Sequence, residues 1–285
     1  MMAVNLTLDN RELAKTYDAI SDSQFNKGCI LIEKLGIQSG DAVLDIGSGT
    51  GRLGRHVLNI IGPAGSYVGI DPLEERVKFA QAKNVHENAV FVTGKAEELN
   101  SITASSIDVV YLSSVFHWVL DKALALREIF RVLKPGGRVG ITTTAKELSS
   151  VTGIKSLTDR VLKRAPYDKL VRLEDSTQNQ HGLTTTELVQ LLTKARLRVK
   201  EVQIQEFPLY YSTAQDVIRF SEASSFGNFL NHVPDSLRAQ AKIDIMTEIE
   251  KNQTAAGIFF DSYTIFAIAR KHGDEYKQPA PTRQD

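Results

Sequence analysis

Two carboxylates and a run of glycines form the most informative pattern in the sequence. Residues 43–51 read VLDIGSGTG, in which Asp45 precedes Gly47, Gly49 and Gly51. Glycine lets a ligand approach the backbone where any Cβ would block it, and a helix that begins after such a loop directs unpaired N–H groups toward the ligand. An acid here suits a positively charged ligand better than a pyrophosphate. The loop therefore predicts a site for a cationic small molecule.

The second carboxylate, Asp71, follows twenty residues after Gly51 in the segment YVGIDP. An acid that ends a second strand can accept hydrogen bonds from both ribose hydroxyls of an adenosine, although it could instead cap the next helix. The strand context favours ribose binding. A dinucleotide fingerprint G-x-G-x-x-G is not met, because Arg52 stands at its last glycine. An NAD(P)-dependent oxidoreductase is therefore an alternative of another class.

Strands and helices are expected to alternate around these residues. Short apolar runs bounded by turn residues predict strands, and the segments between them have helical spacing. This order is typical of a parallel sheet with helices on both faces. The N-terminal part is expected to be helical over 10–35, with a break in SDSQFNKG. The expected strands lie at 42–46, 66–70, 90–93, 108–112 and 138–143, and the helices at about 51–61, 72–83 and 121–133.

The rhythm changes after residue 145. Thr184 begins a segment that resembles a capped helix, Val199–Phe207 is expected to be a strand, 213–250 is mostly helical, and Ile258–Arg270 fits a last strand or a hairpin. We expect the following division: an N-terminal helical cap (1–40), a ligand-binding core (41–145), a sheet completion with a mostly helical substrate lid (146–256), a closing strand (257–272) and a disordered tail (273–285).

Composition limits the function classes. Lys+Arg and Asp+Glu both number 34, so the formal net charge is zero and nothing suggests a nucleic-acid partner. The N-terminus lacks a signal-peptide pattern, and no apolar run reaches the ~18 residues of a membrane helix. The single cysteine, Cys29, allows neither an internal disulfide nor a thiolate metal cluster. We expect a cytoplasmic protein without a metal, as a monomer or homodimer.

Five motifs in order resemble those of class I S-adenosylmethionine (SAM)-dependent methyltransferases, over about residues 10–145. They are VLDIGSGTG, GIDP, TGKAEEL, DVVYLSSVFHWV and LKPGGRV. The resemblance implies an α/β fold: a Rossmann-like, seven-stranded, mostly parallel sheet with helices on both faces and a helical substrate lid. Its antiparallel last strand would be Ile258–Arg270, with Val199–Phe207 beside it at the edge. SAM carries an ammonium and a sulfonium, which suits the acid before the glycines.

The resemblance also implies which residues hold SAM, whose product is S-adenosylhomocysteine. The first glycine loop would hold the methionine part, the acid after the second strand would hold the ribose, and the loop after the third strand would lie beside the adenine. In chain order the cofactor-binding residues would be Tyr17, Gln24, Asp45, Gly47, Ser48, Gly49, Gly51, Asp71, Pro72, Ala96, Glu97 and Ser113. Lys95 stands where the family often has an aspartate, so the backbone of Ala96 is expected to contact the adenine instead.

The segment FHWV resembles a subgroup that methylates small carboxylic acids, namely trans-aconitate, malonyl-carrier-protein and juvenile hormone acid methyltransferases. The expected reaction is therefore SN2 transfer of a methyl group to an oxygen of a small, free or carrier-bound acceptor. A carboxylate needs no base but a hydroxyl does, and His117 is the candidate base or orienting donor. The alternative is a structural histidine that lines the pocket floor. Carbon or nitrogen methylation, and a non-catalytic SAM-binding protein, stay open.

Four lid residues could contact an anionic or aromatic acceptor, and the sequence does not choose among them. They are Tyr210, Tyr211, Arg219 and His232.

Overall fold

The computed structural model describes residues 4–149, 153–176 and 182–272. Seven strands form one sheet in the order β3-β2-β1-β4-β5-β9-β6, and only β9 runs antiparallel to its neighbours β5 and β6. This confirms the expected α/β class and sheet. The strands are β1 (Ala42–Ile46), β2 (Ser66–Asp71), β3 (Ala89–Thr93), β4 (Ile107–Ser113), β5 (Leu133–Thr144), β6 (Leu197–Glu206) and β9 (Tyr263–Lys271).

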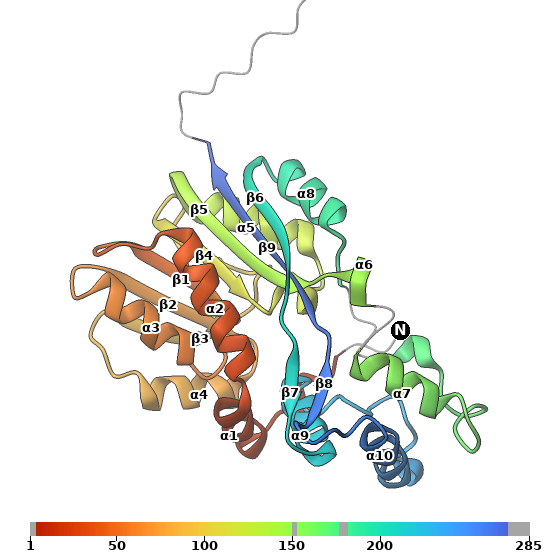
Figure 1. Cartoon of the computed structure of the whole chain (residues 1–285). Helices are drawn as coiled ribbons and strands as arrows, with labels where there is room; N and C mark the ends of the chain where they lie inside the picture. Colours follow the sequence, from red (N-terminus) through yellow and green to blue (C-terminus); the bar gives the residue numbers. More distant parts are fainter. Residues whose placement is uncertain (1–3, 150–152, 177–181, 273–285) are drawn as a thin grey trace, which may run out of the picture.

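Helices cover both faces of this sheet (Figure 1). One apolar layer joins the strands to α2 (Asp22–Leu35), α3 (Arg52–Ile61) and α4 (Glu74–Lys83), and the other joins them to α5 (Lys122–Val132) and α8 (Thr185–Lys194). Alternate residues of one strand enter opposite layers, as Val43 and Leu44 of β1 do. Strands buried on both sides are typical of parallel sheets, which explains why β1 is so apolar.

The expected break at SDSQFNKG is wrong in extent. Helix α1 (Arg11–Ile20) ends at Ser21, and α2 begins directly at Asp22 and continues through the rest of that segment to Gly36, whose φ of 59° ends it. The polar residues of this segment suggest a loop, but Gly28 is a close packing contact with α3. A Cβ on Gly28 would lie 2.6 Å from a Leu53 methyl carbon. Packing against α3 therefore favours helix where polarity suggests a loop.

The apolar run Ile258–Arg270 is neither one strand nor a hairpin. It divides at Asp261 and Ser262 into β8 (Ile258–Phe260) and β9, which belong to different sheets. β8 pairs with β7 (Leu209–Tyr211) beyond the end of the large sheet, and a separate apolar cluster packs there with α7 (Ile154–Leu162), α9 (Ala214–Ser224) and α10 (Asp235–Glu250) (Figure 1). The chain thus builds a second small layer before it returns to the core.

Four short helices occur in the described ranges in addition to the elements above. The tail expected to be disordered, 273–285, lies outside the described residues. The short helices are η1 (Leu6–Leu8), η2 (Phe116–Trp118), α6 (Lys146–Ser149) and η3 (Leu173–Asp175). The capped helix expected at Thr184 is confirmed, because Thr184 and Glu187 form a capping box at the start of α8. Within the described ranges, no helix is both long and apolar enough to cross a membrane.

Gly140 sets how closely α2 approaches the sheet. A Cβ at this position of β5 would lie 2.7 Å from Leu35 Cδ1 and 3.0 Å from Leu31 Cδ1. We expect Gly140→Val to lower the free energy of unfolding by about 1–3 kcal/mol through overpacking, and Gly140→Ala to lower it less. Urea unfolding followed by circular dichroism measures both. A valine variant as stable as the wild type would contradict this packing of α2.

Candidate functional site

The glycine loop lies at the carboxyl ends of β1 and β2. The backbone N–H groups of Gly47 and Ser48 donate to the Ile70 carbonyl oxygen at 2.6 and 3.0 Å. Gly47 has a φ of 80°, and a Cβ on it would come within 2.2 Å of Val115, so no larger residue fits. A Cβ on Gly49, whose φ is 54°, would meet nothing closer than a Tyr17 ring carbon at 3.9 Å. The loop therefore presents bare backbone to the space in front of it.

Gly51 differs from the other two glycines. Its φ is also positive, at 77°, but a Cβ there would meet Asn84 Nδ2 at 2.4 Å and Ala80 at 3.0 Å, both from α4 and its C-terminus. It lines neither of the two cavities described below. The sequence grouped it with the ligand-binding glycines, whereas its place in the structure is a packing contact between the start of α3 and α4.

Asp71 holds the loop and the next helix together. Its Oδ2 accepts a hydrogen bond from the Gly49 N–H at 2.9 Å, and its Oδ1 accepts one from the Leu73 N–H at 2.9 Å. The N-cap of α4 is Leu73 without a side-chain cap bond, so Asp71 is not the N-cap itself but accepts from the N–H of the N-cap residue. Burial raises the pKa of Asp71, while the Arg76 charge and the two backbone hydrogen bonds lower it. The carboxylate faces the cavity with lone pairs to spare.

Asp45 is almost fully buried, with 2% of its surface exposed. Its Oδ2 accepts hydrogen bonds from the hydroxyls of Tyr67 and Tyr111, each at 2.7 Å, and these two tyrosines come from β2 and β4 on either side of β1. Burial raises the pKa of Asp45 to about 7, against the lowering effect of both hydroxyls. Two donors on one oxygen orient the carboxylate, and its surface opens only to a small cavity of about 60 Å³ beside the loop.

A larger cavity of about 480 Å³ adjoins the same loop. It gathers residues from the N-terminal helices, from the ends of β1, β2 and β4, and from the loop after β3. Of the residues expected to hold a cofactor it contains Tyr17, Gln24, Gly47, Gly49, Asp71, Pro72, Ala96, Glu97 and Ser113. Asp45 and Ser48 line the small cavity, which shares Tyr17, Gln24, Gly47, Gly49 and Ser113 with the large one. Eleven of the twelve residues thus meet at one place.

The carboxylate of Glu97 has a structural partner. Its Oε1 accepts hydrogen bonds from the N–H groups of Leu120 and Asp121 at 3.0 and 3.1 Å, just before α5. Glu97 therefore lines the cavity mainly as a fixed wall. Lys95 and Ala96 lie beside it on the same loop and also face the cavity.

His117 lies on η2 and also lines the large cavity. Its Nδ1 is 3.4 Å from the Thr143 hydroxyl, and its ring contacts Trp118 at 5.2 Å between centroids. Burial, together with the charges of Lys122 and Lys27, lowers the pKa of His117 to about 3. The imidazole is therefore neutral at physiological pH.

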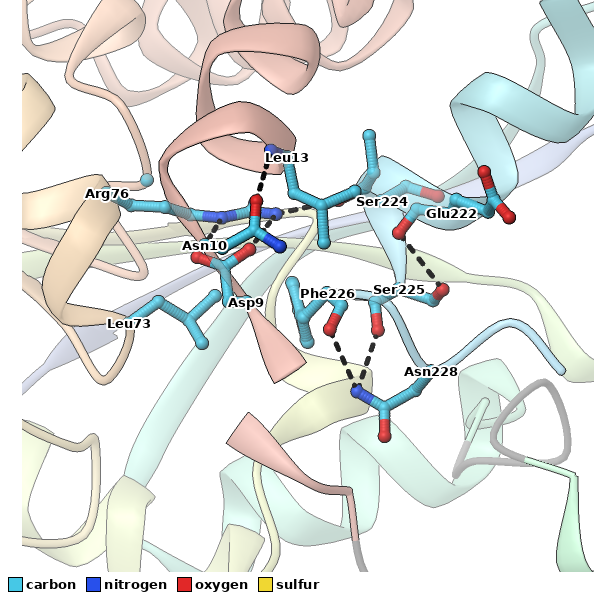
Figure 2. Close-up of polar contacts among 12 residues, drawn as sticks. Asp9, Asn10, Leu13, Leu73, Arg76, Glu222, Ser224, Ser225, Phe226 and Asn228 are labelled. Atoms are coloured by element: carbon cyan, nitrogen blue, oxygen red, sulfur yellow. Dashed lines mark hydrogen bonds and ion pairs between the residues drawn. The ribbon is translucent and has the colours of Figure 1, made fainter. Parts of the chain in front are cut away.

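Arg76 joins the core to the segments that roof the cavity (Figure 2). Its guanidinium is 3% exposed, pairs with Asp9 at 3.3 Å and donates to the Ala223 carbonyl oxygen at 2.6 Å. The same group lies over the rings of Tyr17 at 4.4 Å and Phe226 at 4.8 Å. A buried pair of this kind is costly to break, so it fixes the N-terminal segment and the end of α9 over the cavity.

The sequence missed Arg76, and it missed Tyr67, Tyr111 and Lys27 as well. Their partners are separated from them by many residues, so local pattern gave little signal; only the position of Tyr67 and Tyr111 on strands flanking β1 pointed toward Asp45. The lid residues left open by the sequence, Tyr210, Tyr211, Arg219 and His232, line neither cavity.

A family model described as a methyltransferase domain matches residues 44–141, which run from β1 into β5. The ubiquinone/menaquinone biosynthesis C-methyltransferase UbiE of Ectopseudomonas mendocina is 38% identical over 119 residues, covering 40% of this chain and 46% of that protein. An uncharacterized methyltransferase of Mycobacterium bovis is 31% identical over 160 residues, covering 53% and 62%. The chain thus spans about half the length of the former and less than two thirds of the latter.

The fold is that of solved methyltransferase-like structures. The YcgJ protein of Bacillus subtilis superposes with a TM-score of 0.61 at 20% identity, covering 87% of this chain and 98% of that one. Residues 44–141 thus resemble a methyltransferase domain, and the two relatives named above are both methyltransferases. The expected membership of a carboxylate O-methyltransferase subgroup is not part of this result, because the named relative is a C-methyltransferase.

The residues present suit the cofactor of a SAM-dependent methyltransferase domain. Gln24 Oε1 and Ser48 Oγ are buried beside the glycine loop, and neither has a hydrogen-bond partner within the described part of the chain. Buried polar atoms without partners are rare in folded proteins. Together with two buried carboxylates, they suit a ligand that carries an ammonium group and ribose hydroxyls. Among the described residues, no cluster of three or more His, Cys, Asp or Glu could hold a metal ion.

The raised pKa of Asp45 predicts a pH-dependent stability for the cofactor-free protein. Folding favours the protonated carboxyl, so this contribution is complete below the unfolded pKa of about 3.9 and is lost as pH rises toward about 7. We expect unfolding free energy to fall over this interval more steeply in the wild type than in Asp45→Asn, by up to about 4 kcal/mol. Urea unfolding across pH measures the two slopes; parallel slopes would contradict the assignment.

Proposed function

We propose that the protein transfers a methyl group from SAM to a small-molecule acceptor that enters the 480 Å³ cavity. The observation that carries this proposal is the meeting of two buried carboxylates, Asp45 and Asp71, at a loop of bare backbone that opens into that cavity. A cation is stabilised by such a pair, whereas a pyrophosphate would be repelled by it. This contrast supports SAM over a dinucleotide.

Each part of SAM has a proposed partner. Its ammonium group lies near Asp45 and Ser48, with the methionine chain along Gly47 and Gly49. Its ribose hydroxyls donate to Asp71. Its adenine lies against Pro72 and the backbone of Ala96. Support comes from the cavities, which all of these residues line.

The remaining cofactor contacts come from the segments over and around the crevice. Gln24 and Tyr17 close over the cofactor from the N-terminal helices, Ser113 lies near its amino-acid end, and Glu97 holds the wall beside the adenine. The segments 1–40 and 146–256 act as cap and lid. The contacts of Arg76 with Asp9 and Ala223 support this closure.

When bound, SAM supplies a methyl group on a positively charged sulfur, which SN2 displacement converts to a neutral thioether. The chain's own contribution is alignment and exclusion of water. Trp118 and Phe226, whose rings lie 4.8 Å apart, close the cavity on its apolar side. Fixed walls of this kind favour in-line approach of the acceptor.

Carbon is the methylated atom that the relatives favour. The UbiE relative is named a C-methyltransferase, whereas the sequence motifs suggested transfer to oxygen. We therefore propose an electron-rich carbon, such as one conjugated to an ionised hydroxyl, as the main acceptor. A carboxylate oxygen is the second candidate, because a buried lysine, Lys27, lines the cavity and suits an anion.

His117 acts in this proposal as a neutral orienting group. A base works best when its pKa lies near the operating pH, and that of His117 lies near 3. The imidazole can still donate or accept one hydrogen bond at the acceptor, next to the Thr143 hydroxyl.

The role of His117 is testable without a substrate. We expect its ring resonances to show no titration near the ordinary histidine pKa of about 6.5, because burial and two lysine charges keep it neutral. Nuclear magnetic resonance across pH measures this, and the His117→Gln variant assigns the signals. An inflection near the ordinary value would restore His117 as a candidate base.

The role of Asp71 is testable by SAM affinity. We expect Asp71→Ala to weaken SAM binding more than about tenfold, since it removes a charge-assisted acceptor for the ribose. Isothermal titration calorimetry measures the affinity. Because the variant also frees the N–H groups of Gly49 and Leu73, circular dichroism must show that it stays folded.

Asp108→Asn is the matched control. This acid lies at the opposite end of the sheet, where it pairs with Lys134 at 2.7 Å, and its variant should bind SAM like the wild type. Unchanged affinity in Asp71→Ala would refute the ribose assignment, and a wild type that does not bind SAM at millimolar concentration would refute the proposed function.

A further inference from the structure

Lys27 is a buried lysine that faces the large cavity. It lies on α2, and only 7% of its surface is exposed. Both Lys27 and Gln24 line the cavity, and they lie three positions apart on the helix, which is about 4.5 Å along its axis. Gln24 borders the glycine loop as well. Lys27 therefore follows Gln24 by about one helical turn on the wall of the same cavity.

The charge of Lys27 has no acidic partner within the described residues. Its one described contact is with the Phe207 ring, whose centroid lies 5.2 Å from Nζ. Burial alone lowers the pKa of Lys27 to about 8, and no carboxylate contributes to the shift. Burying an ammonium group without a counterion is costly, and an aromatic face offsets this only in part. Such a group is typical of a site that a ligand completes.

The charges around the cavity divide into two ends. At one end, Asp71 interacts with Arg76, Asp9 and the loop backbone, and Lys27 does not contribute to its pKa. At the other end, Lys27 and Lys122 both lower the pKa of His117. The described acid near this end is Glu97, which acts on Lys122 and accepts from the N–H groups before α5. Of these two lysines, Lys27 is the one that lines the cavity, so it gives this end its positive charge.

Neutral hydroxyls complete this end of the cavity. Thr143, Thr144, Ser262 and Thr264 line it from the ends of β5 and β9. Hydroxyl groups can donate to an anion while Lys27 supplies the charge.

We propose that Lys27 binds an anionic oxygen of the methyl acceptor, and so selects small molecules that carry a carboxylate or a ring-conjugated oxyanion. This inference rests on the proposed function, because it gives the cavity a cationic donor at its acidic end and an anionic acceptor at its basic end. Methyl transfer then takes place between a cationic sulfonium donor and an anionic acceptor. The acceptor's electron pair forms the new bond to the methyl carbon, the carbon–sulfur bond breaks, and its electrons neutralise the sulfonium. When the acceptor atom is a ring carbon, its hydrogen then leaves as a proton to water, which restores the conjugated ring and its oxyanion.

Two matched ligand pairs test the selection. Benzoate and benzamide have the same shape but differ in charge. 4-Nitrophenolate and 4-nitroanisole also differ in charge, and their shapes differ only by a methyl group. We expect protein saturated with S-adenosylhomocysteine to bind at least one anion about tenfold more tightly than its neutral partner, and Lys27→Met to abolish most of this preference. Isothermal titration calorimetry measures all four ligands. Preference for benzoate identifies a carboxylate acceptor, and preference for 4-nitrophenolate identifies a ring oxyanion.

Lys34→Met is the control, because Lys34 lies on the same helix but pairs with Glu201 at 2.7 Å outside the cavity. This variant should keep the full preference, and Lys27→Arg, which keeps the charge, should keep part of it. A wild type that binds no anion or shows no preference for anions, or a Lys27→Met variant that keeps the wild-type preference, would overturn the proposal.

SAM titrations separate the two proposals. Lys27→Met should bind SAM with the wild-type affinity, since none of the cofactor contacts proposed above involves Lys27. If the wild type binds SAM but prefers no anion, the acceptor proposal fails and the methyltransferase proposal stands. If the wild type does not bind SAM, the anion titrations are repeated without S-adenosylhomocysteine; a preference for anions through Lys27 would then show an anion site, while the methyltransferase proposal and the acceptor role both fail.

Discussion

The site depends on keeping two carboxylates buried at the ends of adjacent strands. Neighbouring parallel strands β1 and β2 bring Asp45 and Asp71 to the same edge of the sheet. Buried charge is costly unless it is hydrogen-bonded, and each acid has two donors: tyrosine hydroxyls on Asp45, and backbone N–H groups on Asp71. The bond from Gly49 to Asp71 ties the loop to β2. The positive-φ glycines, the bare backbone and the acidic end of the cavity all follow from this arrangement.

Patterns within a few residues predicted much of the fold. The alternation of apolar runs and helices gave the parallel sheet, and the family resemblance gave the antiparallel β9 between β5 and β6. Such patterns failed where packing overrides them. Gly28 looks like a helix breaker but is a close contact in α2. The run at 258–270 divides between two sheets, and the sequence does not reveal the division because both parts are apolar and aromatic.

Site residues could be predicted where a local motif marks them. They could not be predicted where the site depends on contacts between residues far apart in the sequence. Asp45 and Asp71 follow directly from motif and strand ends. Gly51 shares the motif but packs on α4 instead, since alternating glycines do not say which way each Cα faces. The pairing of Arg76 with Asp9, 67 residues apart, and the burial of Lys27 depend on tertiary contacts that no local pattern encodes.

A crystal structure with S-adenosylhomocysteine bound is the most direct test of the central claim. The account predicts the amino-acid end of the ligand against Gly47 and Gly49 near Asp45, and both ribose hydroxyls within hydrogen-bond distance of the Asp71 carboxylate. A ligand bound elsewhere in the cavity, with these two acids untouched, would contradict it.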